Sequence, residues 1–126
     1  MPTPRVLLVD DSPGFLESAA HFLSAETWLQ VVGSGLSGRD ALEQADVLRP
    51  DLVLMDWAMP EMDGLEATRH LKARSDAPRV ILITLHASPE YKAAAEEAGA
   101  DGFLAKAEFG TGLLPLIRGL FPASAD

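Results

Sequence analysis

Short runs of strand-forming residues alternate with amphipathic stretches along the whole chain. The runs cover residues 5–9, 28–32, 51–55, 79–83 and about 101–104. The first, third and fourth runs are almost continuously apolar, which is typical of strands whose two faces are both covered. These runs therefore predict strands of a parallel sheet.

Helix start signals stand in front of four of the intervening stretches. A Ser or Asp cap satisfies free backbone N–H groups, and proline is well tolerated at the first helical position. Pro50 should end the second helix, and Gly99 should follow the fourth. A fifth, short apolar helix is predicted around 113–121, with Pro115 in its first turns. The four start signals are Ser12 with Pro13, Ser37 with Asp40, Asp63 with Glu66, and Ser88 with Pro89.

Five alternations of strand and helix predict an α/β fold. The expected architecture is flavodoxin-like, a doubly wound sheet of five parallel strands in the order 2-1-3-4-5 with helices on both faces. At 126 residues, 48% of them hydrophobic, the chain is long enough for one domain with a sizeable core. We expect a single domain over 1–126, with its core at about 5–120 and a frayed end at 122–126.

Polar residues follow four of the five predicted strands. Asp10 and Asp11 follow the first strand, Asp56 the third and Thr84 the fourth, and Lys106 lies just beyond the fifth. In a sheet of this order the ligand crevice lies between the carboxyl ends of the adjacent first and third strands. The three aspartates should therefore converge there, with Thr84 and Lys106 beside them.

Three carboxylates at close range repel one another, so at least one should have a raised pKa. A hard divalent cation would relieve the repulsion, and oxygen-only ligands suit Mg²⁺. With Lys106 as a further positive charge and Thr84 as a donor, the site suits a phosphoryl group, and Asp56 is the best placed nucleophile. Each residue alone has an ordinary explanation, such as Asp11 in a helix cap, but their placement at four strand ends favours a common function.

The composition narrows the partners and the compartment. There are 19 acidic and 10 basic residues, a formal charge of −9, which argues against nonspecific binding to nucleic acid or to an anionic membrane. Without cysteine there is no disulfide, thiolate metal site or thiol nucleophile, which suits a reducing cytoplasm. We find no secretion signal and no apolar run of membrane-spanning length, and we expect a cytoplasmic protein.

Four segments together resemble the receiver domain of two-component response regulators, the CheY-like family. The resemblance extends from Arg5 to about Leu120. The segments are VLLVDDS at 6–12, DLVLMDWAMPEMDG at 51–64, ILITLHAS at 81–88 and GADGFLAKAEF at 99–109.

The resemblance implies a phosphorylation-dependent switch in a phosphorelay, not an enzyme. Asp56 would accept a phosphoryl group from a phosphohistidine on a sensor histidine kinase or a phosphotransfer protein. Mg²⁺ or Mn²⁺ would be bound by Asp11 and Asp56 directly, by Asp10 through water, and by the backbone carbonyl of Ala58.

The resemblance also implies how the switch and its lifetime are controlled. Thr84 and Lys106 would hold phosphoryl oxygens, and Phe103 would be the aromatic that turns inward as Thr84 moves toward the phosphate. The side chains of Ala58 and His86 would overhang the approach of hydrolytic water. Because His86 is larger than Ala58 and can donate or accept hydrogen bonds, we expect it to govern the lifetime more than Ala58 does.

Two departures from the commonest pattern favour receivers of the NarL/LuxR type. Ala107 follows Lys106 where a cis-proline is usual, and Leu85 follows Thr84 where a small residue is frequent. Such receivers normally carry a helix-turn-helix output domain, for which this chain has no room, so it is either a stand-alone receiver or part of a longer regulator. Its partner would be an output protein or a DNA-binding domain, and the phosphorylated form could become a homodimer.

The sequence leaves three alternatives. Residues 33–38 spell the G-x-G-x-x-G of a dinucleotide site, but that function leaves the acids and the lysine unexplained, and the glycines better serve a turn and close packing of the second helix. An Asp-nucleophile phosphatase needs a second acid two positions after the first, where Ala58 stands. A pseudo-receiver acting only through protein contacts is disfavoured by the complete set of acids, threonine and lysine.

Overall fold

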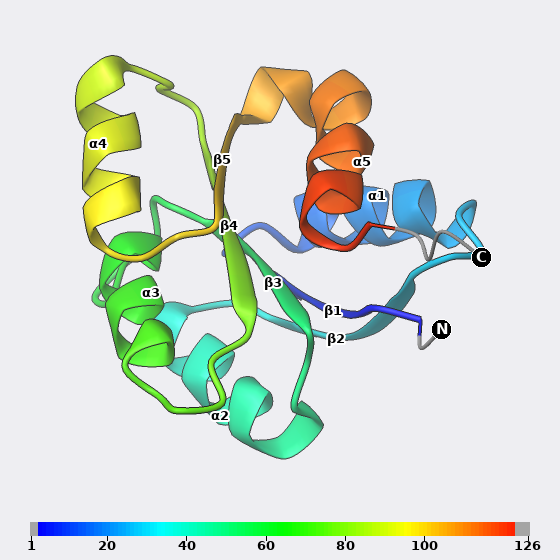
Figure 1. Cartoon of the computed structure of the whole chain (residues 1–126), viewed down its shortest axis with the longest axis horizontal. Helices are drawn as coiled ribbons and strands as arrows, with labels where there is room; N and C mark the ends of the chain where they lie inside the picture. The colour runs from blue at the N-terminus through cyan, green and yellow to red at the C-terminus, as the bar shows by residue number, and fades with distance from the viewer. Residues whose placement is uncertain (1–2, 123–126) are drawn as a thin grey trace.

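Five parallel strands form the sheet of the structure, which is a computed structural model and describes residues 3–122. The strands pair in the order β2-β1-β3-β4-β5, with every neighbouring pair parallel (Figure 1). The predicted flavodoxin-like, doubly wound α/β fold is confirmed. Of the predicted frayed end at 122–126, only Pro122 lies within the described residues. The strands are β1 (Arg5–Val9), β2 (Gln30–Gly35), β3 (Leu52–Asp56), β4 (Arg79–Thr84) and β5 (Gly102–Ala105).

Helices cover both faces of this sheet. Helices α1 and α5 pack on one face, and α2, α3 and α4 on the other (Figure 1). Successive residues of a strand point to opposite faces, so Leu8 belongs to the core under α1 and α5, while Leu7 and Val9 belong to the core under the other three. The helices are α1 (Pro13–Ser24), α2 (Gly38–Leu48), α3 (Gly64–Lys72), α4 (Pro89–Glu97) and α5 (Phe109–Leu120), the last entered through a 3₁₀ turn (Lys106–Glu108).

The four predicted start signals all cap helices. In each case the side chain accepts a hydrogen bond from the backbone N–H three residues on, at 2.9–3.3 Å, and such a cap typically contributes about 1 kcal/mol. As predicted, α2 ends before Pro50, and Gly99 follows α4 with a φ of +94° that favours glycine. The four capping residues are Ser12, Ser37, Asp63 and Ser88.

Strand β2 lies further along the chain than predicted. The prediction at 28–32 followed the apolar residues, whereas the strand runs through the glycines to Gly35 and pairs only with β1. A Cβ added at Gly33 would lie 2.6 Å from Leu48 Cδ1, and one added at Gly35 would lie 2.9 Å from Asp40 Cβ. The expected turn at these glycines is therefore wrong, while their expected role in close packing of α2 is confirmed.

Helix α5 begins earlier than predicted. It starts at Phe109 and carries Pro115 in its interior instead of its first turns. Proline removes one backbone N–H, but Pro115 is exposed, and the buried side chains of Leu113 and Ile117 on either side hold the helix against the sheet. Phe109, the first residue of this helix, directly follows the 3₁₀ turn that Lys106 begins.

Candidate functional site

Three carboxylates meet at the carboxyl ends of β1 and β3. Asp56 is the last residue of β3, Asp10 follows β1 directly, and Asp11 comes next. One oxygen from each lies within 4.8 Å of the others. Asp10 and Asp56 are 1% and 6% exposed, and Asp11 is exposed. The structure thus brings together the three acids that the strand order predicts at this point.

Local hydrogen bonds fix the two buried acids. Asp10 donates its backbone N–H to Gly35 O at 3.1 Å, and its Oδ1 accepts from the backbone N–H of Ser12 at 2.8 Å. Below Asp56 the chain approaches so closely that a Cβ at Gly64 would lie 2.2 Å from the Asp56 carbonyl oxygen. Only glycine fits there, so Gly64 allows α3 to begin directly under the end of β3.

Lys106 reaches into the acid cluster from the end of β5. Its Nζ lies 2.9 Å from Asp10 Oδ2 and 3.7 Å from Asp56 Oδ1, and its side chain is 19% exposed. Burial alone would lower the pKa of Lys106, but the hydrogen bond to Asp10 and the charges of the three aspartates raise that pKa above its usual value. The lysine therefore carries a positive charge at neutral pH.

The opposing charges leave an unbalanced site. Burial, followed by repulsion from Asp10, raises the pKa of Asp56 to about 6, with Lys106 acting in the opposite direction. Three carboxylates against one ammonium leave an excess of negative charge next to an exposed acid. Such a site can bind a hard cation through oxygen ligands and can present Asp56 to an electrophile.

The other predicted residues lie around this cluster. Thr84 is the last residue of β4 and is 4% exposed; its Oγ1 accepts a hydrogen bond from the backbone N–H of His86 at 3.1 Å. Ala58 and His86 are exposed, in the segments that follow β3 and β4. Within residues 3–122 the structure gives the His86 side chain no hydrogen bond or ion pair. Its predicted role at the site thus rests on position alone.

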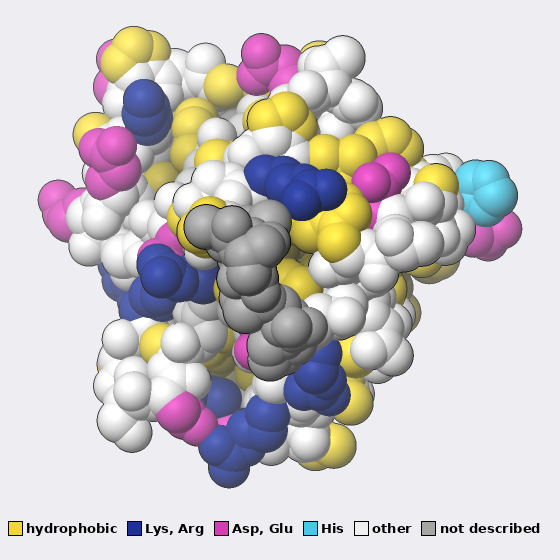
Figure 2. Space-filling view, turned by 45° about the vertical axis from the view of Figure 1, so that its right-hand side comes forward, with side chains coloured by type: hydrophobic (Ala, Val, Ile, Leu, Met, Phe, Trp, Pro, Cys, Tyr) yellow, Lys and Arg dark blue, Asp and Glu magenta, His cyan; other side chains and the backbone are white. Residues whose placement is uncertain are grey.

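A second candidate site lies at the other end of the sheet. Figure 2 shows Lys and Arg side chains gathered in the lower half of the molecule, where Figure 1 places the starts of β3 and β4. A cavity of about 640 Å³ is lined there by Arg49, Arg74 and Arg79, among others. Arg74 pairs with Asp46 at 2.7 Å, and Arg49 pairs with Asp76. These arginines are already neutralised, so the cavity is a weaker candidate than the acid cluster.

Comparison with known proteins decides the family. Residues 6–117 match the response regulator receiver domain. The chain belongs to this family. Within residues 3–122, this receiver domain has no helix long and apolar enough to cross a membrane.

Relatives of this receiver domain occur in several kinds of regulator. It is 43% identical over 103 residues, 81% of the chain, to a protein-glutamate methylesterase/protein-glutamine glutaminase of Pseudomonas aeruginosa, and it spans 28% of that protein. It is 35% identical over 114 residues, 90% of the chain, to the response regulator VraR of Staphylococcus saprophyticus, and it spans 54% of that protein. A LuxR-family response regulator of Aurantimonas has a similar structure, with a TM-score of 0.89 and 30% identity over 94% of this chain and 85% of that one.

An aromatic cluster in the receiver domain was missed by the sequence analysis. The ring of Trp57 lies 4.9 Å from that of Tyr91 on α4 and 6.1 Å from that of Phe103 on β5. Trp57 is 9% exposed, whereas Tyr91 is 38% exposed. The alternation of side chains along β3 could have predicted this position, because Trp57 follows Asp56 and faces the opposite side of the sheet.

Proposed function

We propose that this receiver domain is a phosphorylation-dependent switch with Asp56 as its phosphoacceptor. The donor would be a phosphohistidine on a sensor histidine kinase or a phosphotransfer protein. The observation that carries this proposal is the position of Lys106 Nζ, 2.9 Å from Asp10 and 3.7 Å from Asp56, inside a cluster of three carboxylates. A positive charge at this place can hold an incoming phosphoryl oxygen without displacing the acceptor.

The proposed transfer is a single displacement at phosphorus. A carboxylate oxygen of Asp56 attacks the phosphorus atom while the bond from phosphorus to the donor imidazole nitrogen breaks. The electron pair of that bond stays on the imidazole, and Asp56 becomes an acyl phosphate. Because the pKa of Asp56 is about 6, most of the acceptor is ionised at neutral pH and can act as the nucleophile.

The donor set fits Mg²⁺ or Mn²⁺. Asp11 and Asp56 would bind the ion directly, Asp10 through water, and Ala58 through its backbone carbonyl; all of these are oxygen ligands. When bound, such an ion supplies positive charge that neutralises phosphoryl oxygens. The closeness of the carboxylates, within 4.8 Å of one another, supports this part of the proposal.

The proposed switch runs through Thr84. Its Oγ1 accepts a hydrogen bond from the backbone of His86, so the hydroxyl proton remains available to donate to a phosphoryl oxygen. Phe103 would respond by moving inward beside Trp57, altering the surface formed by α4, β5 and α5. We propose this surface as the contact for an output protein, a DNA-binding domain or a second copy of the phosphorylated domain.

The test is intact mass after treatment with acetyl phosphate and Mg²⁺. We expect a gain of one phosphoryl group in the wild type, no gain in Asp56→Ala, and wild-type behaviour in Asp76→Asn, an exposed acid far from the cluster. Phosphorylation at full rate in EDTA would contradict the metal site. Sustained hydrolysis of a phosphomonoester that depends on Asp56 would favour the phosphatase alternative over a switch that loses its phosphoryl group slowly.

A further inference from the structure

We propose that Phe15 is a positioning residue for Lys106. The proposal rests on the proposed function, because Lys106 is the group that would meet the phosphoryl oxygens. Phe15 lies in the first turn of α1. It acts by holding the ammonium group that contacts the acids.

The ring of Phe15 and the carboxylates enclose the ammonium group. Lys106 Nζ lies over the ring, 4.2 Å from its centroid, and also 2.9 Å from Asp10 and 3.7 Å from Asp56. The negative face of an aromatic ring attracts a cation at this distance. The ammonium is therefore held from the aromatic side and from the acid side together.

The Lys106 side chain needs a contact that restricts its position. Its side chain is long and flexible, and it starts a 3₁₀ turn in which Ala107 follows it. Ordering a lysine side chain costs rotamer entropy. A ring already in place restricts the lysine before a phosphoryl group arrives, and the ammonium can move along its face from Asp10 toward Asp56 without losing the attraction.

The position of Phe15 is itself coupled to the acid cluster. Ser12 donates its backbone N–H to Asp10 Oδ1 at 2.8 Å, and its Oγ accepts from the backbone N–H of Phe15 at 3.2 Å. The cap of α1 thus fixes Phe15 relative to Asp10. On its other side the ring meets that of Phe109 edge-on, with centroids 5.3 Å apart, so the ring contacts both ends of the turn that carries Lys106.

Phe22 provides a matched control. It lies on the same helix, is also partly buried, and contacts the same partner, with its ring 5.5 Å from that of Phe109. Lys106 lies over Phe15 and not over Phe22. Phe15→Leu and Phe22→Leu therefore remove similar packing, and only the first removes the contact with the ammonium.

The first measurement is the NMR shift of the Lys106 ε protons in the unphosphorylated domain. Protons above an aromatic face are shifted upfield, so this signal should lie upfield of those of Lys72 and Lys92. The upfield shift should vanish in Phe15→Leu and persist in Phe22→Leu and Phe15→Tyr. An unchanged shift in Phe15→Leu would overturn the proposal.

The second measurement is the affinity for beryllofluoride with Mg²⁺, which mimics the phosphoryl group. Phe15→Leu should raise the dissociation constant about two- to fivefold, the range expected for an exposed to half-buried cation–π contact. Phe15→Tyr should restore the affinity, and Phe22→Leu should leave it unchanged. Equal losses in Phe15→Leu and Phe22→Leu would mean that packing alone is responsible. If the wild type binds no beryllofluoride, the proposed function fails, and the ε-proton shift still decides the role of Phe15.

Discussion

Lys106 makes its shortest contact in the cluster with Asp10, not with Asp56, the proposed acceptor. The distances from Nζ are 2.9 Å to Asp10 Oδ2 and 3.7 Å to Asp56 Oδ1. Asp10 therefore holds Lys106 beside Asp56, and the lysine does not fully neutralise the charge of Asp56. Burial and the charge of Asp10 therefore still raise the pKa of Asp56 to about 6, and the cluster keeps negative charge for a cation or an electrophile.

The raised pKa of Asp56 predicts how stability depends on pH when metal is absent. The folded state holds this proton up to about pH 6, whereas the unfolded chain releases it near 3.8. The folded state therefore binds more protons between these values, and stability falls as the pH rises through this window. Asp56→Asn removes the penalty and should be more stable than the wild type at pH 7.5, by on the order of 3 kcal/mol.

Urea unfolding in EDTA at pH 4 and pH 7.5 measures this effect. The difference in free energy of unfolding between Asp56→Asn and the wild type should grow with pH. A constant difference would contradict the raised pKa.

Metal binding should reverse this instability. A ligand that binds only the folded state stabilises it by about 2.7 kcal/mol at one hundred times its dissociation constant. We expect Mg²⁺ to raise the melting temperature more at pH 7.5 than at pH 5, because protons compete for Asp56 at the lower pH. Asp11→Asn should lose most of the Mg²⁺ effect while keeping the melting temperature in EDTA, because Asp11 is exposed. An equal Mg²⁺ effect in the wild type and in Asp11→Asn would show that Asp11 does not bind the metal.

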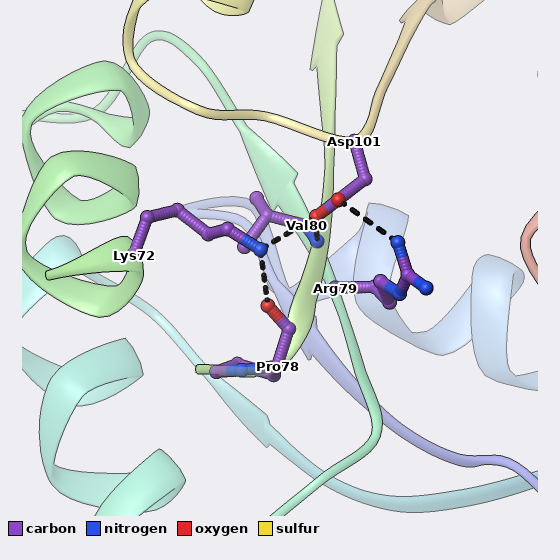
Figure 3. A network of polar contacts seen from close by, with 5 residues as sticks. All are labelled: Lys72, Pro78, Arg79, Val80 and Asp101. Atoms are coloured by element: carbon purple, nitrogen blue, oxygen red, sulfur yellow. Dashed lines mark hydrogen bonds and ion pairs between the residues drawn. The ribbon is translucent and has the colours of Figure 1, made fainter. Parts of the chain in front are cut away.

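Asp101 anchors a polar network around the start of β4 (Figure 3). Its carboxylate accepts hydrogen bonds from Lys72 Nζ at 2.9 Å, from the backbone N–H of Val80 at 2.8 Å and from Arg79 Nη1 at 3.3 Å. Lys72 also donates to Pro78 O at 3.0 Å. The network joins the end of α3 to the starts of β4 and β5.

Asp101→Asn should destabilise the fold by about 1–3 kcal/mol, because Lys72 loses its carboxylate in a mostly buried place. Burial alone would raise the pKa of Asp101, but the bonds from Lys72 and Val80 lower it overall. Its contribution is therefore present above about pH 4 and is lost as the pH falls through the lower folded-state pKa. Asp76→Asn is the control, since the pair of Asp76 with Arg49 is exposed on both sides and should contribute less than about 1 kcal/mol. The measurement is urea unfolding at pH 7. Equal losses of unfolding free energy in Asp101→Asn and Asp76→Asn would contradict this prediction.

Trp57 offers a reporter for the proposed switch. Its ring contacts those of both Tyr91 and Phe103, so a movement of Phe103 should change its fluorescence when beryllofluoride and Mg²⁺ are added. The measurement needs Trp28→Phe, because Trp28 is the second tryptophan of the chain. In that background Thr84→Ala should still bind beryllofluoride but show a smaller change. A full change without the Thr84 hydroxyl would show that Phe103 responds by another route.

The sequence predicted the fold well because strand and helix periods, caps and apolar runs are local signals. Asp56 and Thr84 were placed by the rule that parallel strands end at one edge, and the structure puts both at strand ends. Tertiary packing decided the rest. Gly33 and Gly35 disfavour a strand locally, but they let α2 approach the sheet closely. Pro115 disfavours the interior of a helix, but the buried neighbours Leu113 and Ile117 hold α5 against the sheet. Contacts such as Lys106 over Phe15 have no signature in spacing and emerge only in three dimensions.

The lifetime of the phosphorylated state should depend on His86. Its backbone N–H donates to Thr84 Oγ1, which ties its position to the proposed switch, while its side chain is exposed and free to face the site. Ala58 is too small to shield the acyl phosphate or to orient a water molecule. A histidine can do either, because its ring is large and can donate or accept a hydrogen bond.

We therefore expect the decay rate of the phosphorylated domain to change in His86→Ala. His70→Ala is the matched control, an exposed histidine on α3 whose nearest carboxylate is Glu66 at 3.9 Å. Ala58→Asn tests the other position and should change the rate less than His86→Ala does. The measurement is the loss of the phosphorylated mass over time. If His86→Ala decays at the wild-type rate, water reaches the phosphoryl group without passing His86, and the lifetime is set by the acids and Lys106 alone.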